Sequence, residues 1–285
     1  MSDSFSANLA GKVAVVTGGG GILCAEMARA LAASGAAVAI LDLKLEAAEA
    51  VAAELRASGA KAIGLAANVL ERESLETAAA QVLAELGPCD LLVNGAGGNH
   101  PKGTTSRETF SPEDLDNPDP ALVSFFTLAP EGMRFVFDLN FLGTLLPSQV
   151  FARQMVGRAG CSILNISSMN AFRPLTKIPA YSAAKAAVSN FTQWLATHLA
   201  PAGIRVNAIA PGFFVTHQNH ALLFGTDGQP TARANKILNG TPMKRFGEAK
   251  ELSGTLLWLA SEAASGFVNG VVVPVDGGFS AYSGV

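Results

Sequence analysis

Residues 12–42 read KVAVVTGGGGILCAEMARALAASGAAVAILD, and this stretch decides the fold. Its two apolar runs, Lys12–Thr17 and Ala37–Asp42, predict strands, and the alanine-rich run Ile22–Ala33 between them predicts a helix. A helix that joins two consecutive strands predicts parallel pairing with a right-handed crossover. The four glycines between the first strand and the helix predict a tight turn at the carboxyl end of that strand.

The same alternation of strand-like and helix-like runs continues along the chain. The predicted strands are apolar on both faces, as a sheet covered by helices on both sides requires. We therefore expect one α/β domain over residues 1–285, with a doubly wound parallel sheet of about seven strands and helices on both faces. The further strands are expected at Ala60–Ala66, Asp90–Asn94, Cys161–Ser167, Ile204–Ile209 and Gly270–Val275, and the further helices at Leu45–Ser58, Glu71–Leu86, Pro130–Val156, Ala180–Ala200 and Glu248–Ser261.

Two long segments break this rhythm. The first, residues 98–127, is rich in Pro, Asp, Ser and Thr, and the second spans residues 213–239. Long excursions inside a compact domain are usually functional loops. Both segments follow the end of a predicted strand, so we expect a loop insertion and a substrate loop that overhang the ligand crevice.

The composition narrows the class of protein. Of the 285 residues, 49% are hydrophobic and 15% charged, which supports a large core and excludes a disordered chain. The net charge of −3, without a basic stripe, gives no reason to expect nucleic acid as a partner. The three cysteines lack a paired metal-ligand spacing, and we find neither a signal peptide nor an apolar run of roughly 18 residues. We expect a cytoplasmic protein with no metal and no membrane contact.

The glycine turn and Asp42 predict a dinucleotide site. Glycines let the backbone approach a pyrophosphate, and the N-terminus of the following helix offers free N–H groups, although a plain flexible turn has the same composition. Asp42, at the end of the second strand, can accept hydrogen bonds from ribose hydroxyls and would repel a 2′-phosphate. This favours NAD(H) over NADP(H), although the nearby Lys44 partly offsets the repulsion of a 2′-phosphate. The alternative interpretation is that Asp42 caps a helix or is a solvent-facing carboxylate.

Tyr181 and Lys185 carry the predicted chemistry. They stand four residues apart in a helical run, which places both on one face. A neighbouring ammonium favours the phenolate and lowers the pKa of a tyrosine, so the pair can exchange a proton with a carbonyl oxygen. Ser168 follows a predicted strand and can donate a hydrogen bond to the same oxygen. Asn140 is a polar residue in an apolar helical run, and we consider a bond to its own helix backbone as the alternative to a site role.

Taken together, these motifs resemble the short-chain dehydrogenase/reductase family over nearly the whole chain, including Asn94-Gly-Ala-Gly97, Pro211-Gly212 and Asp276-Gly-Gly278. The resemblance implies a Rossmann-type fold and a homotetramer. It also implies a catalytic tetrad: Tyr181 as acid/base, Lys185 as its activator and ribose clamp, Ser168 as carbonyl orienter and Asn140 as holder of a relay water. Thr216 is implied to touch the nicotinamide carboxamide. The full set of expected cofactor-binding residues is Gly18, Gly20, Gly21, Ile22, Asp42, Asn68, Val69, Asn94, Ala96, Gly97, Tyr181, Lys185, Pro211, Gly212 and Thr216.

Two departures from the family pattern concern the cofactor end. The family's T-G-x-x-x-G-x-G motif would place glycines at the positions of Ile22 and Cys24. We prefer a loop one residue shorter, with Gly21 as the second glycine and Leu23 at the third position, over replacement of both glycines. An Asn68-Val69 pair also stands where the family usually has Asp-Val at the adenine, and an amide can still bond the adenine edge.

Polar and cationic residues around the crevice favour a small, hydroxylated, anionic substrate. Ordinary solvated loop charge is the alternative reading of them, and for His217 and His220 we prefer substrate hydroxyls to a metal. Four stretches, among them residues 97–100 and 210–220, resemble a subgroup of the family, the D-mannonate oxidoreductases, which implies the interconversion of D-fructuronate and D-mannonate. The candidate substrate residues are His100, Arg173, Lys177, His217, Asn219, Lys244 and Arg245.

Three other readings remain open. The chain could be a dehydrogenase of another polyol or sugar acid such as gluconate, or an acyl-carrier reductase, against which Asp42 and the absence of a basic docking patch weigh. It could also bind a cofactor without catalysis, because fold does not fix function. We further expect a homo-oligomer, with the apolar strand Val271–Val275 and the tail Phe279–Val285 against a partner chain.

Overall fold

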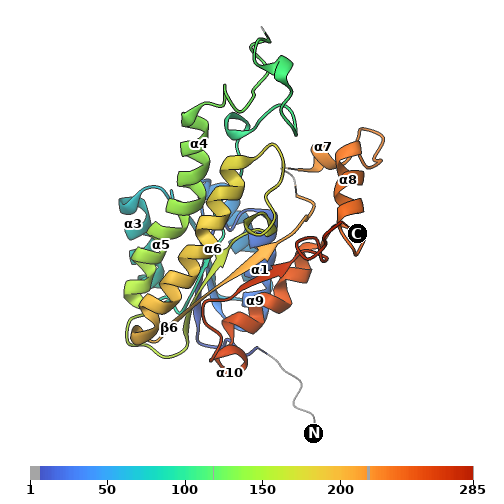
Figure 1. The fold of residues 1–285 in the computed structure, drawn as a ribbon. Helices are drawn as coiled ribbons and strands as arrows, with labels where there is room; N and C mark the ends of the chain where they lie inside the picture. Colours follow the sequence, from blue (N-terminus) through green and yellow to red (C-terminus); the bar gives the residue numbers. More distant parts are fainter. Residues whose placement is uncertain (1–6, 118, 217–218, 285) are drawn as a thin grey trace.

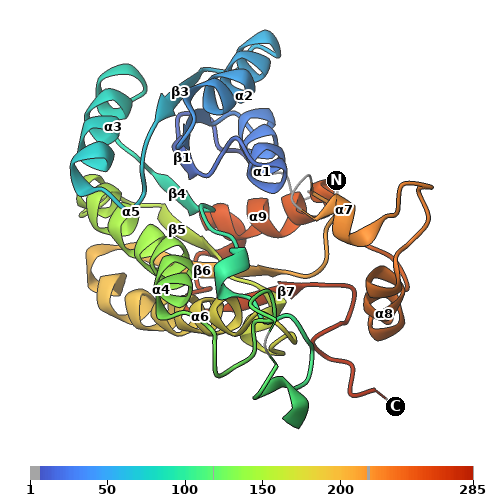
Figure 2. The same cartoon turned by 90° about the horizontal axis from the view of Figure 1, so that it is seen from above.

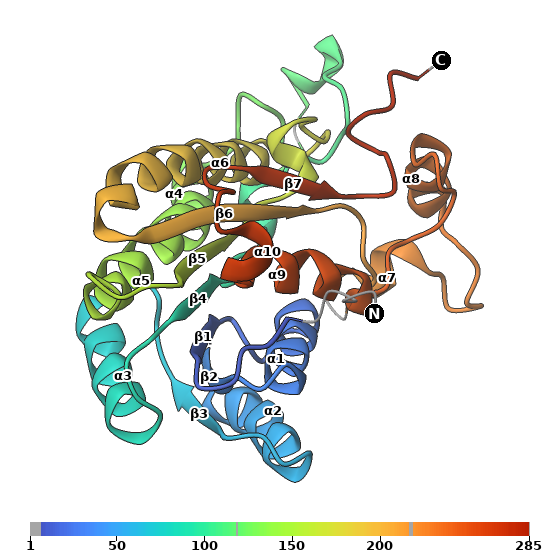
Figure 3. The same ribbon diagram turned by 90° about the horizontal axis from the view of Figure 1, so that it is seen from below.

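One sheet of seven parallel strands forms the centre of the protein, in the order β3-β2-β1-β4-β5-β6-β7 (Figure 3). This computed structural model describes residues 7–117, 119–216 and 219–284. The sheet confirms the predicted fold class, because strand and helix alternate along the chain and the strand count is as expected. The strands are β1 Val13–Thr17, β2 Ala37–Asp42, β3 Ala62–Ala66, β4 Leu91–Asn94, β5 Cys161–Ile166, β6 Ile204–Pro211 and β7 Val272–Val275.

Helices cover both faces of the sheet (Figure 2). Buried side chains of α1, α2 and α9 pack against one face, and those of α3, α5 and α6 pack against the other. Strands β1, β4, β5 and β6 are buried along their whole length, which accounts for their mostly apolar sequence. The helices are α1 Ile22–Ala33, α2 Leu45–Ala57, α3 Arg72–Glu85, α4 Pro130–Phe137, α5 Gly143–Phe151, α6 Pro179–Leu199, α7 His220–Leu223, α8 Ala232–Gly240, α9 Ser253–Ala260 and α10 Glu262–Ser265.

The strand order reverses between β1 and β4. The chain runs outward from β1 to β3 on one side and returns to β4 on the other side of β1. In such sheets the loops after the two strands at the reversal separate, and they leave a crevice at the carboxyl ends. The glycine turn after β1 and the Gly95–Gly98 loop after β4 therefore border the same crevice.

The predicted helix over residues 130–156 is interrupted. It comprises α4, a π-helical turn at Asp138–Leu142, α5 and a 3₁₀ turn at Ala152–Gln154. Sequence periodicity did not reveal the π turn, because one extra residue per turn changes the apolar pattern only locally. By length and composition the stretch Pro130–Gln154 could cross a membrane, contrary to our expectation that no segment would; half of its most apolar window is buried inside the protein, as in a core helix.

The two long segments differ from one another. Residues 98–127, which we call the arm, project beyond the end of α4 (Figure 1). Of regular structure, the described residues of the arm hold the short 3₁₀ turns Pro101–Gly103 and Pro112–Asp114 alone. The segment 213–239, expected as a loop, instead contains α7 and most of α8. Helix α8 escaped prediction because it is short and carries two asparagines, yet Thr231 caps it by accepting a hydrogen bond from the Ala234 N–H at 3.2 Å.

Candidate active site

The glycine turn fits tightly between its neighbours. Gly18 has a φ of +64°, and a Cβ on it would lie 2.8 Å from the Ala96 Cα. A Cβ on Gly20 would lie 2.7 Å from the Ala47 Cβ and 3.0 Å from Asp42 Oδ2. Only glycine suits these positions, so the turn brings bare backbone to the edge of the crevice.

The N-terminus of α1 is open to an anion. The helix begins at Ile22 with Gly21 as its N-cap, and no side chain caps it. Its first N–H groups lack intrahelical partners and carry the positive end of the helix dipole. A pyrophosphate fits such a terminus, so the turn and the helix together suit a dinucleotide.

The close contact between α1 and the β4 loop is made by Cys24, not by Leu23. A Cβ on Gly95 would collide with the Cys24 Sγ, so the space that the thiol fills exists because residue 95 is glycine. The shorter-loop alignment that placed Leu23 at the third glycine position is therefore wrong. Burial raises the pKa of Cys24 to about 12, which makes this thiol a packing group rather than a nucleophile.

Asp42 lies beside the glycine turn, as predicted. Its two carboxylate oxygens each accept one backbone N–H, from Gly20 and from Lys44, both at 3.1 Å. Each oxygen retains further acceptor capacity, which ribose hydroxyls can use. The carboxylate thus stands at the end of β2, beside the glycine turn.

The side chains of two other expected cofactor residues form hydrogen bonds within the fold. The Asn94 amide is buried and donates 2.9 Å hydrogen bonds to Ser148 and Asn165, so its side chain ties the sheet to α5 and does not face the crevice. The Asn68 amide bonds Glu71 at 2.8 Å and organises the start of α3. Thr17, which sequence reasoning did not select as a site residue, accepts the N–H groups of Gly95 and Ala96 at 3.1 and 3.3 Å and holds the β4 loop against the glycine turn.

The last expected cofactor residues take part in packing and in turns. Val69 is buried, and its Cγ2 would lie 3.1 Å from a Cβ on Gly143. The Gly212 N–H bonds the Val275 carbonyl at 2.9 Å, which holds the turn after Pro211 to β7. The Thr216 N–H donates a 2.8 Å hydrogen bond to Asn219 Oδ1, so the Asn219 side chain holds the local turn.

Lys185 and Tyr181 lie one turn apart on α6. The Lys185 Nζ lies 5.7 Å from the centroid of the Tyr181 ring and donates a 2.7 Å hydrogen bond to the Ile166 carbonyl. The side chain is 3% exposed, and its burial lowers the lysine pKa from 10.5 to about 8. The ammonium therefore remains charged near neutral pH, although it lies close to its titration range.

The prediction that Lys185 lowers the pKa of Tyr181 is wrong for this structure. Burial raises the pKa of Tyr181, and only the Ser168 hydroxyl opposes the rise. The reason is geometric: the Lys185 Nζ points to the Ile166 carbonyl and lies over the ring, so it does not contact the phenolic oxygen. Ser168 Oγ accepts the Asn170 N–H at 3.2 Å, which leaves its own proton available to another oxygen.

Asn140 lies in the π turn and anchors the root of the arm. Its amide nitrogen donates to the carbonyls of Gly98 and Val136, both at 2.7 Å, and its Oδ1 accepts the Gly98 N–H at 3.1 Å. The bond to Val136 is the intrahelical one that we considered as the alternative. Both amide hydrogens are thus used, and Asn140 acts as a positioning residue through its side chain.

Gly97 is the point where these groups meet. A Cβ on it would lie 2.6 Å from Asn140 Oδ1 and 3.2 Å from Lys185 Nζ. The amide and the ammonium therefore flank the same piece of backbone at the end of β4. The structure thus brings Asn140, Ser168, Tyr181 and Lys185 together at the crevice, beside the glycine turn.

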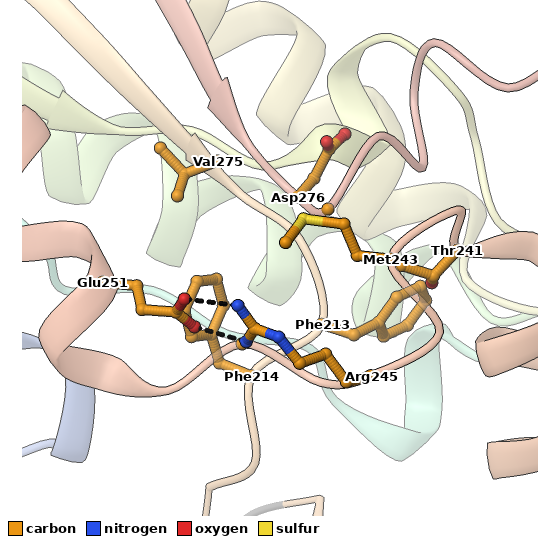
Figure 4. Close-up of a pocket in the computed structure, with 10 residues that line it drawn as sticks. Phe213, Phe214, Thr241, Met243, Arg245, Glu251, Val275 and Asp276 are labelled. Carbon is orange, nitrogen blue, oxygen red and sulfur yellow. Dashed lines mark hydrogen bonds and ion pairs between the residues drawn. The ribbon is translucent and has the colours of Figure 1, made fainter.

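Two of the expected substrate residues are bound elsewhere. Arg245 makes a two-pronged ion pair with Glu251, at 2.6 and 2.7 Å, beside a cavity of about 100 Å³ (Figure 4). Lys244 Nζ donates to the Asn239 carbonyl at 2.8 Å. Arg245 is therefore unsuited to grip a substrate carboxylate, because its fork already holds one.

Three others remain suited to a ligand, whereas His217 lies outside the described residues. Arg173 uses its Nε for a 3.1 Å bond to the Ser280 carbonyl, and its two terminal nitrogens have no partner among residues 7–117, 119–216 and 219–284. Lys177 has a φ of +72°, rare for a side chain with a Cβ. His100 Nδ1 accepts the Lys102 N–H at 3.1 Å, which places the ring proton of the neutral form on Nε2 as a donor.

The arm contacts elements on both sides of the crevice. Its Thr105 N–H bonds the Lys177 carbonyl at 2.8 Å, and its Glu108 forms an ion pair with Lys236 of α8. The hydrogen bond with Lys236 is the main cause that lowers the pKa of Glu108. The arm and α8, far apart in the sequence, are thus linked by this ion pair.

Comparison with known proteins identifies the family of this chain. The family model of the short chain dehydrogenases matches residues 12–223. The chain belongs to this family. An oxidoreductase of Haemophilus influenzae whose activity is uncharacterized is 57% identical over 285 residues, with 100% of this chain and 99% of that protein covered.

Two solved structures resemble this one. A Haemophilus influenzae protein, proposed to be a D-mannonate oxidoreductase and solved with bound NAD, is 57% identical, with a TM-score of 0.92 over 98% of both chains. A gluconate 5-dehydrogenase of Burkholderia cenocepacia, in complex with NADP and tartrate, is 31% identical, with a TM-score of 0.81 over 97% of this chain and 98% of that one. This protein is thus an oxidoreductase of the same fold.

The lowered pKa of Lys185 predicts a pH-dependent stability. Because the folded protein releases this proton near pH 8 and the unfolded chain releases it near 10.5, the free energy of unfolding should rise between these values. Lys185→Met removes this titrating group. The difference in the free energy of unfolding between variant and wild type should therefore change by about 3 kcal/mol between pH 8 and 10.5. Urea unfolding without added cofactor, from pH 7 to 10.5, measures it; a difference that stays constant with pH contradicts the assignment.

Proposed function

We propose that this protein is an NAD(H)-dependent oxidoreductase that interconverts the ketone and secondary alcohol of a small sugar acid, foremost D-fructuronate and D-mannonate. The observation that carries the proposal is the convergence of Ser168, Tyr181 and Lys185 next to the glycine turn. The 57% identity to the NAD-bound Haemophilus protein supports the cofactor and the substrate.

The cofactor end would hold the dinucleotide. Gly18 and Gly20 would let the backbone approach the pyrophosphate, the free N–H groups of α1 would bind it, and Asp42 would receive the ribose hydroxyls. Lys185 of α6, whose Nζ bonds the Ile166 carbonyl at the end of β5, would reach the second ribose. When bound, the nicotinamide supplies or accepts the hydride, and the protein orients it and excludes water.

The proton side of the reaction belongs to Tyr181. In reduction, its phenol would donate a proton to the substrate oxygen as that oxygen gains charge, and in oxidation the phenolate would take the proton back. Ser168 would donate a hydrogen bond to the same oxygen and so hold the reacting carbon in place. In this structure burial raises the pKa of Tyr181 and so favours the phenol, the form that donates in reduction, while the Lys185 ammonium lies 5.7 Å from the centroid of the ring.

The substrate's carboxylate would bind the rim of the crevice. Arg173 has two terminal nitrogens that lack partners in the described ranges, and Lys177 is the next cation along the same loop. Planar guanidinium groups bind carboxylates in a fork, which gives both affinity and orientation. The similarity to the gluconate 5-dehydrogenase supports a second candidate, the oxidation of gluconate or a related sugar acid at the same site.

Asp42 predicts the choice of cofactor. The wild type should use NADH with a catalytic efficiency at least about tenfold above that for NADPH, because a carboxylate repels the 2′-phosphate. Asp42→Ala should lose catalytic efficiency with NADH, so that its efficiencies with NADH and NADPH become more similar. Lys44→Ala is the matched control and should increase the preference for NADH, because it removes the nearby positive charge. Steady-state kinetics with both cofactors decide; a wild type that prefers NADPH would refute the proposal.

The carboxylate-binding role of Arg173 predicts substrate class. Dehydrogenation of D-mannonate and D-gluconate should exceed that of a neutral polyol such as mannitol. Arg173→Met should lower kcat/KM for the acids by about 10- to 100-fold, the value of one or two charged hydrogen bonds, and leave mannitol unaffected. Arg134→Met, an exposed arginine on α4, serves as the control. A clear preference for mannitol in the wild type would end the sugar-acid proposal.

A further inference from the structure

The C-terminal segment that follows β7 reaches the loop that carries Arg173. Strands β5, β6 and β7 are neighbours in the parallel sheet, so their carboxyl ends lie at one edge. Arg173 belongs to the loop after β5 and Ser168, whereas Ser280 follows β7. The Arg173 Nε nevertheless donates a 3.1 Å hydrogen bond to the Ser280 carbonyl. Residues 276–280 therefore pass the end of β6 and join the proposed carboxylate-binding residue.

Asp276 holds this segment in its folded-back course. It directly follows β7; its Oδ1 accepts the Gly278 N–H at 2.9 Å, and its Oδ2 accepts the Ser280 N–H at 2.8 Å. Gly278 has a φ of +86°, which suits glycine in such a turn. Because the N–H and the carbonyl of Ser280 belong to one residue, the carboxylate that binds the first also restricts the second.

Packing holds the same segment against the loop after β6. The Phe279 ring lies edge-on to the Phe213 ring, with the centroids 5.2 Å apart. A Cβ on Gly240, the last residue of α8, would lie 3.2 Å from Phe279 Cε2. The residue just before Ser280 is thus packed on two elements, so the Ser280 carbonyl is an acceptor in a defined place.

An acceptor in a defined place orients the guanidinium of Arg173. The group is planar, so a hydrogen bond from Nε restricts the direction in which the two terminal nitrogens point. Those two nitrogens lack partners in the described parts of the chain, and together they form the fork that binds a carboxylate. Since the Arg173 side chain is exposed, it would otherwise lose rotamer freedom when a substrate binds.

We propose that Asp276 is a positioning residue of the substrate site, which acts on the substrate's carboxylate through the Ser280 carbonyl and Arg173. This inference rests on the proposed function, in which Arg173 binds that carboxylate. The C-terminal segment would order the arginine before the substrate arrives, so that less freedom is lost on binding. Because Asp276 would not touch the substrate itself, its removal should weaken the use of acids and spare neutral polyols.

The test is a double-mutant cycle with an acid and a neutral substrate. Asp276→Ala should lower kcat/KM for the preferred sugar acid about 3- to 10-fold, the cost of ordering one long side chain, mainly through KM. Its kinetics with mannitol should stay unchanged. In the Arg173→Met background the same substitution should have no further effect, because Asp276 acts only through Arg173. Asp276→Asn retains one acceptor oxygen and should lie between the wild type and the alanine variant.

A second variant and a control complete the cycle. Ser280→Pro removes the N–H that Asp276 Oδ2 binds, so it should reproduce the effect of Asp276→Ala and replaces that variant if it does not fold. Asp119→Ala is the control, because the Asp119 Oδ1 accepts the Ala121 N–H at 2.9 Å in an exposed turn of the arm. It removes a similar turn carboxylate far along the chain, and its kinetics with both substrates should equal those of the wild type.

The outcomes separate this inference from the proposed function. If Asp276→Ala loses activity equally on the acid and on mannitol, or if its loss multiplies with that of Arg173→Met, Asp276 has a structural role and the inference is wrong, while the sugar-acid proposal stands. The inference also fails if Arg173→Met keeps full activity on the acid. A wild type that prefers mannitol would instead overturn the sugar-acid proposal, and this inference with it.

Discussion

A buried ammonium next to a phenol is the interaction on which the rest of this site depends. Lys185 is almost fully buried, and its charge is held by the Ile166 carbonyl at 2.7 Å. A buried cation without such a partner would lose its proton or destabilise the fold. Strand β5 and helix α6 therefore have to pack in this register, because together they place the ammonium over the Tyr181 ring.

Close backbone contacts at glycines, which have no side chain, bring the glycine turn and Asn140 near Tyr181 and Lys185. Gly97 leaves room for both Asn140 Oδ1 and Lys185 Nζ, and Gly18 lets the turn after β1 lie against Ala96. The contact between Cys24 and Gly95 follows the same rule. The Cys24 thiol of α1 fits against the β4 loop because Gly95 has no side chain there. Close approach, and not flexibility, is what these glycines provide.

Local sequence patterns were sufficient to predict the parallel sheet and to place Tyr181 and Lys185 on one helix. Apolar periodicity placed Ile22–Ala33 and Ala37–Asp42 with their exact bounds, and the four-residue spacing of Tyr181 and Lys185 placed both on α6. What failed depended on contacts between distant segments. The partner of Arg245, the alignment at Cys24 and the raised pKa of Tyr181 are set by Glu251, Gly95 and burial, respectively, and a single sequence does not show such neighbours. The π turn at Asn140 escaped notice for a related reason, because its bonds to Gly98 cross from helix to loop.

The central claim is that the Tyr181 hydroxyl moves the proton while the remaining groups hold the reactants. The most direct measurement is the turnover of Tyr181→Phe, with NADH binding measured in the same preparation and Tyr282→Phe, the other tyrosine of the chain, as control. The account predicts a fall in kcat of about 100- to 10,000-fold, the range for a lost general acid, with the NADH dissociation constant unchanged and the control fully active. Turnover of Tyr181→Phe within a few fold of the wild type would contradict it.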